Sequence, residues 1–181
     1  MDKAQLRAMI RSGSPVAPET SASVVRGLFD WMSPRLPGTV SAFLAMSGEV
    51  DVGDLFDRLP GWRWLLPRVE EDGTMTFRDR SAPRETHRFG MEQPADAGPR
   101  IPVHEIDVIL TPGLAFDLRG GRLGNGAGFY DRALAARRSD SVSVGVTVAD
   151  RVLEAVPMDR HDQPVDWLAT EAGVKECSPR T

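Results

Sequence analysis

The chain has 181 residues, of which 41% are hydrophobic and 27% charged, a composition typical of one globular domain spanning 1–181. Its net charge is −4 and its arginines are scattered, so we expect no nucleic-acid partner. No run of 18 apolar residues occurs and the first residues lack a signal-peptide core, so we expect no membrane contact and a cytoplasmic location. The one cysteine, Cys177, cannot form an internal disulfide, in keeping with a reducing compartment.

Apolar periodicity predicts helices and strands in alternation along the chain. Helices are expected at 2–11, at 22–33 with Thr20 or Ser21 as cap, at 51–59 and at 131–138. Strands are expected at 38–46, 63–69, 75–80, 106–111, 141–148 and, as the last strand, 165–170. Residues 81–104 are expected to form an irregular surface excursion, and 152–156 a short helical or turn segment. This order predicts an α/β fold with a largely parallel sheet, helices on both faces, and ligands at the carboxyl ends of strands.

The segment 107–132 is the most informative part of the chain, because it runs from a predicted strand through a glycine-rich loop into a predicted helix. Glycines at 120, 121, 124, 126 and 128 let backbone N–H groups approach an anion, and the helix that follows directs its positive end to the same place. The spacing G-x-G-x-G and the missing Gly-Lys-Ser/Thr exclude a dinucleotide-binding turn and a Walker A loop. Judged on the glycines alone, a flexible surface loop is an equal alternative.

Charged residues flank this loop in a pattern that suits a phosphate and its metal ion. Arg122 and Arg132 bracket the glycines, and arginine binds phosphate through two parallel hydrogen bonds; alternatively Arg132 pairs with a surface acid. Asp131 and Asp162 offer carboxylate oxygens of the kind that Mg²⁺ accepts. Asp131 is also explained as an acid at a helix start, and the segment around Asp162 as a plain turn.

Two further segments carry candidate binding residues. Lys3, Arg7 and Arg11 recur every four residues, so they form one basic stripe on the first predicted helix. The segment FLAMSGEVD (43–51) ends a predicted strand, and its Glu49 could accept N–H groups of a polar heterocycle beside an apolar wall that includes Leu44. Alternatively, Glu49 is a solvated residue between a strand and a helix. No Cys/His spacing fits zinc, and no G-x-S-x-G nucleophile motif occurs.

Together these segments resemble the 5-formyltetrahydrofolate cyclo-ligase family, also called 5,10-methenyltetrahydrofolate synthetases. The most specific match is PGLAFD followed by G-x-R-L-G-x-G-x-G-x-Y-D-R (112–132), and FLAMSGEVD, LPRV (66–69), FGMEQP (89–94) and HDQPVDWLATE follow in the expected order. The resemblance implies a three-layer α/β/α fold with a mostly parallel sheet, like that of ribose-5-phosphate isomerase and CoA transferases. It implies an enzyme, expected to be a monomer, that uses ATP and Mg²⁺ to convert the reduced folate 5-formyltetrahydrofolate to 5,10-methenyltetrahydrofolate, releasing ADP and phosphate.

The resemblance also assigns roles to individual residues of this chain. Arg122 and Tyr130 fall at catalytic positions, and Asp131 and Asp162 fall where the family holds Mg²⁺. The implied ATP contacts are Lys3, Arg7, Arg122, Leu123, Gly124, Asn125, Gly126, Ala127, Gly128, Phe129 and Tyr130. The implied folate contacts are Leu44, Glu49, Asn125, Gly126, Ala127, Gly128 and Phe129.

The loop departs from the usual family pattern R-L-G-Y-G-G-G-Y-Y-D-R at three positions. Asn125 replaces an aromatic residue, Ala127 a glycine and Phe129 a tyrosine, and SGSPVAPE (12–19) replaces further basic residues after Arg11. Asn125 still tolerates a turn with left-handed backbone, whereas Ala127 adds a Cβ where the backbone approaches phosphate. Two alternatives to the enzyme therefore remain: a non-catalytic relative that binds folate or nucleotide, and a relative with a shifted substrate.

Overall fold

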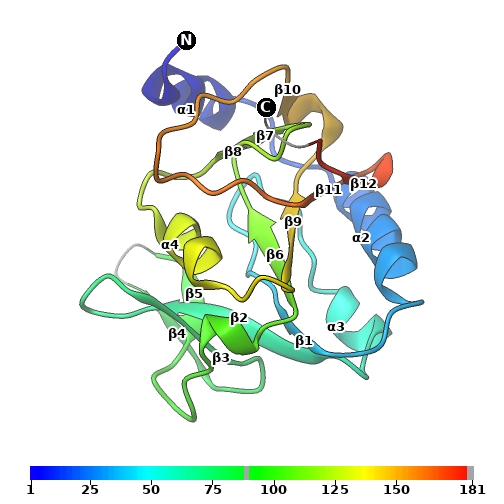
Figure 1. Ribbon diagram of the computed structural model, residues 1–181, viewed down its shortest axis with the longest axis vertical. Coiled ribbons are helices and arrows are strands. Elements are labelled where there is room, and N and C mark those ends of the chain that lie inside the picture. Colours follow the sequence, from blue (N-terminus) through cyan, green and yellow to red (C-terminus); the bar gives the residue numbers. More distant parts are fainter. Residues whose placement is uncertain (88–89, 179–181) are drawn as a thin grey trace.

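The computed structural model describes residues 1–87 and 90–178, and within them a seven-stranded sheet runs in the order β12-β11-β9-β6-β1-β2-β3 (Figure 1). Its strands are β1 (Thr39–Ser41), β2 (Arg63–Val69), β3 (Met75–Asp79), β6 (Val108–Pro112), β9 (Val142–Val146), β11 (Trp167–Thr170) and β12 (Gly173–Glu176). Neighbouring strands from β11 to β2 pair in parallel, whereas the edge strands β3 and β12 are antiparallel. The mostly parallel sheet is therefore confirmed, and β12 shows that 165–170 is not the last strand.

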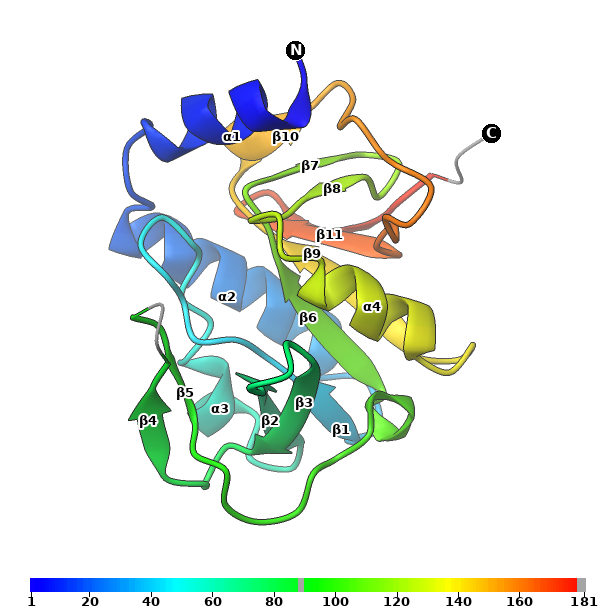
Figure 2. The ribbon, with the colours of Figure 1, turned by 90° about the vertical axis from the view of Figure 1, so that its left-hand side faces the viewer.

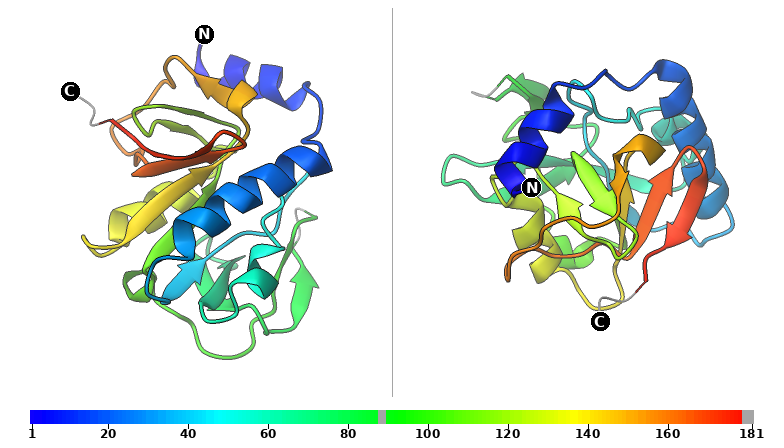
Figure 3. Two further views of the ribbon diagram at one scale, coloured as in Figure 1. Left: turned by 90° about the vertical axis from the view of Figure 1, so that its right-hand side faces the viewer. Right: turned by 90° about the horizontal axis from the view of Figure 1, so that it is seen from above.

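Helices cover both faces of this sheet (Figures 2 and 3). The helices are α1 (Lys3–Arg11), α2 (Pro18–Met32), α3 (Leu55–Arg58) and α4 (Phe129–Ala136), with short 3-10 turns η1 (Val103–Glu105) and η2 (Ala149–Arg151). Trp64 and Leu66 of β2 pack into the core cluster that contains α2 and α3, while Leu65 between them packs into the cluster that contains Leu134 of α4. Successive strand side chains point to opposite faces, so the sheet is buried on both sides and the three-layer arrangement is confirmed.

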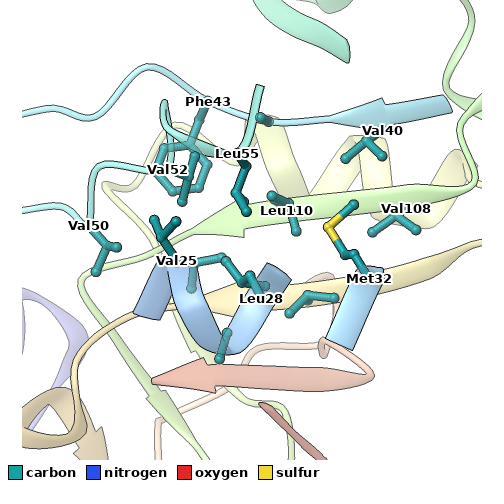
Figure 4. Packing of buried hydrophobic residues seen from close by; sticks show 14 of the residues in the cluster. Val25, Leu28, Met32, Val40, Phe43, Val50, Val52, Leu55, Val108 and Leu110 are labelled. Carbon is teal, nitrogen blue, oxygen red and sulfur yellow. The ribbon is translucent and has the colours of Figure 1, made fainter. Parts of the chain in front are cut away.

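The α2 side of the core is built from one apolar stripe of the helix (Figure 4). Val25, Leu28 and Met32 follow helical spacing and are at most 2% exposed, and they pack against Val40 and Leu110 of the sheet. Burying each such side chain stabilises the fold by about 2 kcal/mol. The helix begins at Pro18 with Ala17 as N-cap, so the predicted cap at residues 20 or 21 is wrong. Proline suits the first helical position because its φ is fixed near the helical value.

Two predicted elements are shorter in the structure than in the sequence analysis. The expected strand 38–46 is hydrogen-bonded as a strand only over β1, because the apolar residues after Ser41 leave the sheet and bury their side chains in loop conformation, as Phe43 does at 4% exposed. The expected helix 51–59 reduces to α3. Asp51 does not cap it, because its Oδ1 accepts the Gly53 N–H at 2.9 Å and forms a turn instead.

The glycine-rich segment contains strands that the sequence analysis treated as loop. Strands β7 (Ala115–Asp117) and β8 (Arg122–Leu123) form a small sheet with β10 (Val152–Leu153), which replaces the expected helix or turn at 152–156. Asp117 is fully buried, and its carboxylate accepts the N–H groups of Arg119 and Gly121 at 2.9 Å and of Val156 at 2.8 Å. This one carboxylate therefore ties the β7–β8 turn to the segment after β10. Helix α1 packs on the small sheet through Leu6.

The excursion 81–104 is more ordered than expected, because it contains the hairpin β4 (Arg84–Thr86) and β5 (Glu92–Pro94). Phe89, part of the FGMEQP match, lies outside the described residues. The hairpin is attached to β2 by Arg68, which bonds to the Pro94 carbonyl at 2.8 Å, and by Gln93, which accepts the Val69 N–H at 3.0 Å. No helix in the described ranges is long and apolar enough to cross a membrane.

Candidate functional site

A cleft of about 570 Å³ opens at the carboxyl ends of β1, β2 and β6. Leu44 lies in the segment that leaves β1, Val69 ends β2, and Pro112 ends β6; all three line the cleft. Strand β1 has β2 on one side and β6 on the other, so the chain turns to opposite sides of β1 as it adds the next strands. Open parallel sheets bind ligands at such a switch point, which is where the sequence analysis places the site.

This cleft brings together all the site residues expected from the sequence. They are Lys3, Arg7, Leu44, Glu49, Arg122, Leu123, Gly124, Asn125, Gly126, Ala127, Gly128, Phe129, Tyr130, Asp131 and Asp162. Other lining residues had no site role expected from the sequence, among them Phe43, Met75, Met91, Gln93 and Asp159, while Arg11 was expected only as part of the basic stripe. The structure thus shows that the expected residues are neighbours, while the ligand that each of them binds stays a prediction.

Ion pairs join the charged residues at one end of the cleft. Arg122 Nη2 lies 2.7 Å from Asp131 Oδ2, and the Gln163 N–H donates to Asp131 Oδ1 at 3.2 Å. Lys3 Nζ bonds to Asp162 Oδ2 and, at 2.7 Å, to Asp159 Oδ2. Burial would raise the pKa of the Asp162 carboxyl, but the bonds from Lys3 and from the Asp159 N–H lower it below its usual value. Asp162 is therefore ionised at neutral pH.

The two predicted metal ligands fit Mg²⁺ by the chemistry of their donor atoms. Asp131 and Asp162 both supply carboxylate oxygens, each anchored by a neighbouring cation. Mg²⁺ binds in this way through one or two carboxylates, and water and substrate phosphates complete its ligands. Among the described residues there is no group of three or more His, Cys, Asp or Glu side chains arranged for a metal. Two carboxylates suit a metal whose remaining ligands are water and a phosphate group.

The glycine loop curves around this charged end. Gly126 has φ of 106° and Gly128 has φ of 68°, a left-handed conformation that glycine adopts without strain. Gly128 is the N-cap of α4, so the first turn of that helix presents unpaired N–H groups beside the loop; the helix begins at Phe129, before the expected Asp131. Within the part of the chain that the structure describes, Arg132 pairs with no surface acid and instead donates to the carbonyls of Ala127 at 3.1 Å and Gly73 at 3.2 Å.

Helix α1 closes over the loop with its basic stripe. Arg7 Nε donates to the Gly124 carbonyl at 2.9 Å, and Arg11 Nη2 donates to Asn125 Oδ1 at 3.0 Å. The helix starts with a capping box in which Asp2 and Gln5 satisfy each other's backbone N–H groups. The stripe predicted from the four-residue spacing is therefore confirmed, and it faces the cleft.

The other end of the cleft is apolar and contains two poorly solvated polar groups. Leu44 and Met75 are among the apolar residues of its lining. Burial raises the pKa of the Glu49 carboxyl, against the lowering effects of the Met46 N–H, which lies 3.0 Å from Oε2, and of Arg151. The Tyr130 hydroxyl is buried without a hydrogen-bond partner among the described residues, and burial followed by the charge of Glu49 raises its pKa. An apolar wall with a few polar groups is typical of sites that bind a heterocycle.

Comparison with known proteins identifies relatives across nearly the whole chain. The model of the 5-formyltetrahydrofolate cyclo-ligase family matches residues 3–171. The chain is 33% identical to 5-formyltetrahydrofolate cyclo-ligase of Mycolicibacterium smegmatis, over 93% of each chain, and 32% identical to that of Escherichia coli, over 76% of this chain and 80% of the relative.

Solved structures show the same fold. The NMR structure of Aquifex aeolicus 5,10-methenyltetrahydrofolate synthetase superposes with a TM-score of 0.83 at 30% identity, covering 100% of this chain and 96% of the other. The synthetase of Mycoplasma pneumoniae, at 22% identity, shares the fold with a TM-score of 0.78 over 94% of this chain and 99% of the other. The match of sequence, fold and cleft shows that the chain belongs to the 5-formyltetrahydrofolate cyclo-ligase family.

Proposed function

We propose that this chain uses ATP and Mg²⁺ to convert 5-formyltetrahydrofolate to 5,10-methenyltetrahydrofolate, releasing ADP and phosphate. The observation that carries the proposal is that a single cleft joins charged side chains and a glycine loop to apolar side chains. In the reaction, the formyl oxygen takes the terminal phosphoryl group from ATP. The neighbouring folate nitrogen then attacks the formyl carbon and loses its proton, and phosphate leaves with the former formyl oxygen. The two ends of the cleft provide for these two reactants.

The charged end is suited to the phosphates of ATP. Arg122 is held in place by Asp131, so its guanidinium can bind a phosphoryl oxygen without first losing much side-chain freedom. Lys3 and Arg7 add positive charge from α1, and the N–H groups of the glycine loop add donors. Asp131 and Asp162 would hold Mg²⁺, which when bound neutralises charge on the phosphates.

The apolar end is suited to the reduced folate. Leu44 and Met46 provide a wall for the heterocycle, and the Glu49 carboxylate accepts its N–H groups. The ring of Tyr130 lies 5.7 Å from the Arg122 guanidinium carbon, and its hydroxyl belongs to the apolar end, where the charge of Glu49 acts on it. Because its pKa is raised, the hydroxyl stays protonated and serves as a hydrogen-bond donor to the substrate rather than as a base. Asn125 and Phe129 also line the cleft, and we place there the meeting of nucleotide and folate.

The direct test is turnover by the purified chain. With ATP, Mg²⁺ and 5-formyltetrahydrofolate we expect absorbance of the methenyl product to rise, and no rise without ATP. Asp131→Asn should abolish the signal, while Asp140→Asn, which changes an exposed acid paired with Arg138 at 2.6 Å, should leave it intact. Folded protein that binds folate and ADP in calorimetry but forms no product would identify the non-catalytic relative and reject the proposal.

We further propose that residues 1–181 act as one domain, as a monomer, in the cytoplasm. Light scattering at micromolar concentration measures the mass of the particle, and a dimer would contradict the monomer. A fluorescent fusion observed in cells tests the location. Neither result affects the turnover assay, so the proposals on oligomeric state and location are tested independently of the proposed reaction.

A further inference from the structure

Lys3 is held by two carboxylates, only one of which belongs to the predicted metal pair. Its Nζ bonds to Asp162 and, at 2.7 Å, to Asp159, and the Asp159 N–H donates to Asp162 Oδ2 at 2.6 Å. The side chain of Asp162 is 19% exposed, whereas that of Asp159 is 76% exposed. The resemblance to the family gives Asp159 no role. Both acids lie in the segment after β10, which runs beside α1 (Figures 1 and 2).

A divalent cation held by Asp162 would disturb this arrangement. It would bring two positive charges close to the Lys3 ammonium, and the two cations would repel each other. Apart from Asp159, this end has two ion pairs, Lys3 with Asp162 and Arg122 with Asp131, so two cations face two carboxylates. Asp159 adds a third carboxylate to these ion pairs, directly next to Lys3.

We propose that Asp159 is a positioning residue for nucleotide binding: it retains Lys3 beside the phosphate end when Mg²⁺ occupies Asp162, and so keeps α1 closed on the glycine loop. This rests on the proposed function, because that function places Mg²⁺ at Asp162. The remaining polar contacts of α1 with the loop, from Arg7 and Arg11, go to Gly124 and Asn125, and Leu6 is its one buried side chain. With so few contacts, losing the anchor at Lys3 should loosen the whole helix.

Hydrogen–deuterium exchange of the α1 amides tests this without turnover. In the free protein, Asp159→Asn should leave α1 exchange close to wild type, because Asp162 still holds Lys3. With saturating Mg²⁺ and ADP, the variant's α1 amides should exchange about two- to five-fold faster than those of the wild type, the range given by one ion pair of this exposure. The matched control is Asp57→Asn, which removes an 89% exposed acid paired with Arg80 at 3.6 Å and should change neither state.

Steady-state kinetics distinguishes a residue that positions Lys3 from one whose replacement disturbs the whole fold. Asp159→Asn should raise the KM for ATP about two- to five-fold and leave kcat within about twofold, because an anchor outside the reacting atoms affects binding. Asp159→Glu should restore most of the affinity. In a Lys3→Met background, Asp159→Asn should add no further effect, since the two residues act through one contact.

Equal α1 exchange in the wild type and in Asp159→Asn with Mg²⁺ and ADP would overturn the inference, as would additive effects of Asp159→Asn and Lys3→Met. A wild-type chain that binds ADP but forms no methenyl product would reject the proposed reaction, while the exchange comparison alone would still decide the role of Asp159. A wild-type chain whose α1 exchange and calorimetry show no response to Mg²⁺ and ADP would overturn both.

Discussion

Replacing Arg78 with methionine should strongly destabilise the protein, because this side chain is the centre of a buried ion network. Arg78 is 0% exposed, and its Nη2 bonds to Glu70 Oε1 at 2.9 Å and to Asp96 Oδ1 at 2.7 Å. Glu70 also receives Arg68 Nε at 3.1 Å. The network connects β3 to the segment around the β4–β5 hairpin, so its loss affects the fold and one wall of the cleft.

The size of the effect follows from what Arg78→Met leaves behind. Removing one partner of a buried pair costs about 3–5 kcal/mol, because the remaining charge is buried without compensation. Glu70 keeps its bonds to Arg68 and Thr76, and methionine fills part of the arginine stem, so the lower limit of about 3 kcal/mol applies. With a urea m value of about 2 kcal/mol/M, the unfolding midpoint should fall by about 1.5 M.

Urea unfolding followed by circular dichroism measures this shift. The control is Arg80→Met on the same strand end, a side chain 42% exposed that pairs with Asp57 at 3.6 Å, for which we expect at most about 0.5 kcal/mol. The KM for folate should also rise in Arg78→Met, since the hairpin carries Gln93 into the cleft lining. A midpoint for Arg78→Met no lower than that of Arg80→Met would refute the claim that the network is a stabilising unit.

Three further predictions concern single carboxyl or hydroxyl groups. Asp131→Asn should lower turnover by about 100-fold or more while the far-UV circular dichroism is unchanged; turnover near wild type would contradict the proposal that Asp131 holds Mg²⁺. Tyr130→Phe should leave stability unchanged or slightly raised, because its hydroxyl has no partner among the described residues, but turnover measured on the same sample should fall. Burial would raise the pKa of the Asp166 carboxyl, but hydrogen bonds from Arg137 at 2.7 and 2.9 Å and from Ser143 lower it. The ionised carboxylate therefore stabilises the fold at pH values above the unfolded-state pKa of about 3.9, and this stabilisation is lost as the pH falls below that value. In urea titrations from pH 5 to pH 3, Asp166→Asn should therefore lose less stability than the wild type, and parallel curves would contradict this.

The main sheet could be predicted from the sequence because its strands are determined by local patterns. The run 63–69 coincides with β2, since its apolar residues are bounded by turn signals on both sides. The small sheet could not be predicted in this way. Strand β8 has only two residues, and β7 finds its second partner in β10, so the pairing depends on contacts made elsewhere, above all by the buried carboxylate of Asp117.

The β4–β5 hairpin was missed for a related reason. It is attached through Arg68, Arg78 and Gln93, and local patterns assign such polar residues to the surface although all three are at most 9% exposed. The residues that line the cleft also fall into those that local sequence patterns reveal and those that only the folded structure brings together. Residues 122–131 were found because they form one contiguous motif. Asp159 was given no role of its own, because only the docking of α1 brings it to Lys3.

The three departures in the glycine loop can now be judged by what these side chains contact. Asn125 accepts a bond from Arg11, the Ala127 carbonyl accepts one from Arg132, and Phe129 lies under the Arg132 guanidinium at 5.3 Å. Only the Asn125 bond depends on the substituted side chain, because the Ala127 bond is made by its backbone carbonyl and a tyrosine ring at position 129 would lie under Arg132 in the same way. Ala127 has no positive φ, which the described chain reserves for glycine, so alanine fits the loop at this position. Contacts of this kind hold the loop in place, and a loop that is already fixed loses less conformational entropy when it binds a phosphate, so the departures alone do not argue for a weakened site. What they remove is aromatic and hydroxyl surface at positions 125 and 129, and this predicts that any change in the enzyme appears in the binding of folate rather than in the binding of ATP phosphates.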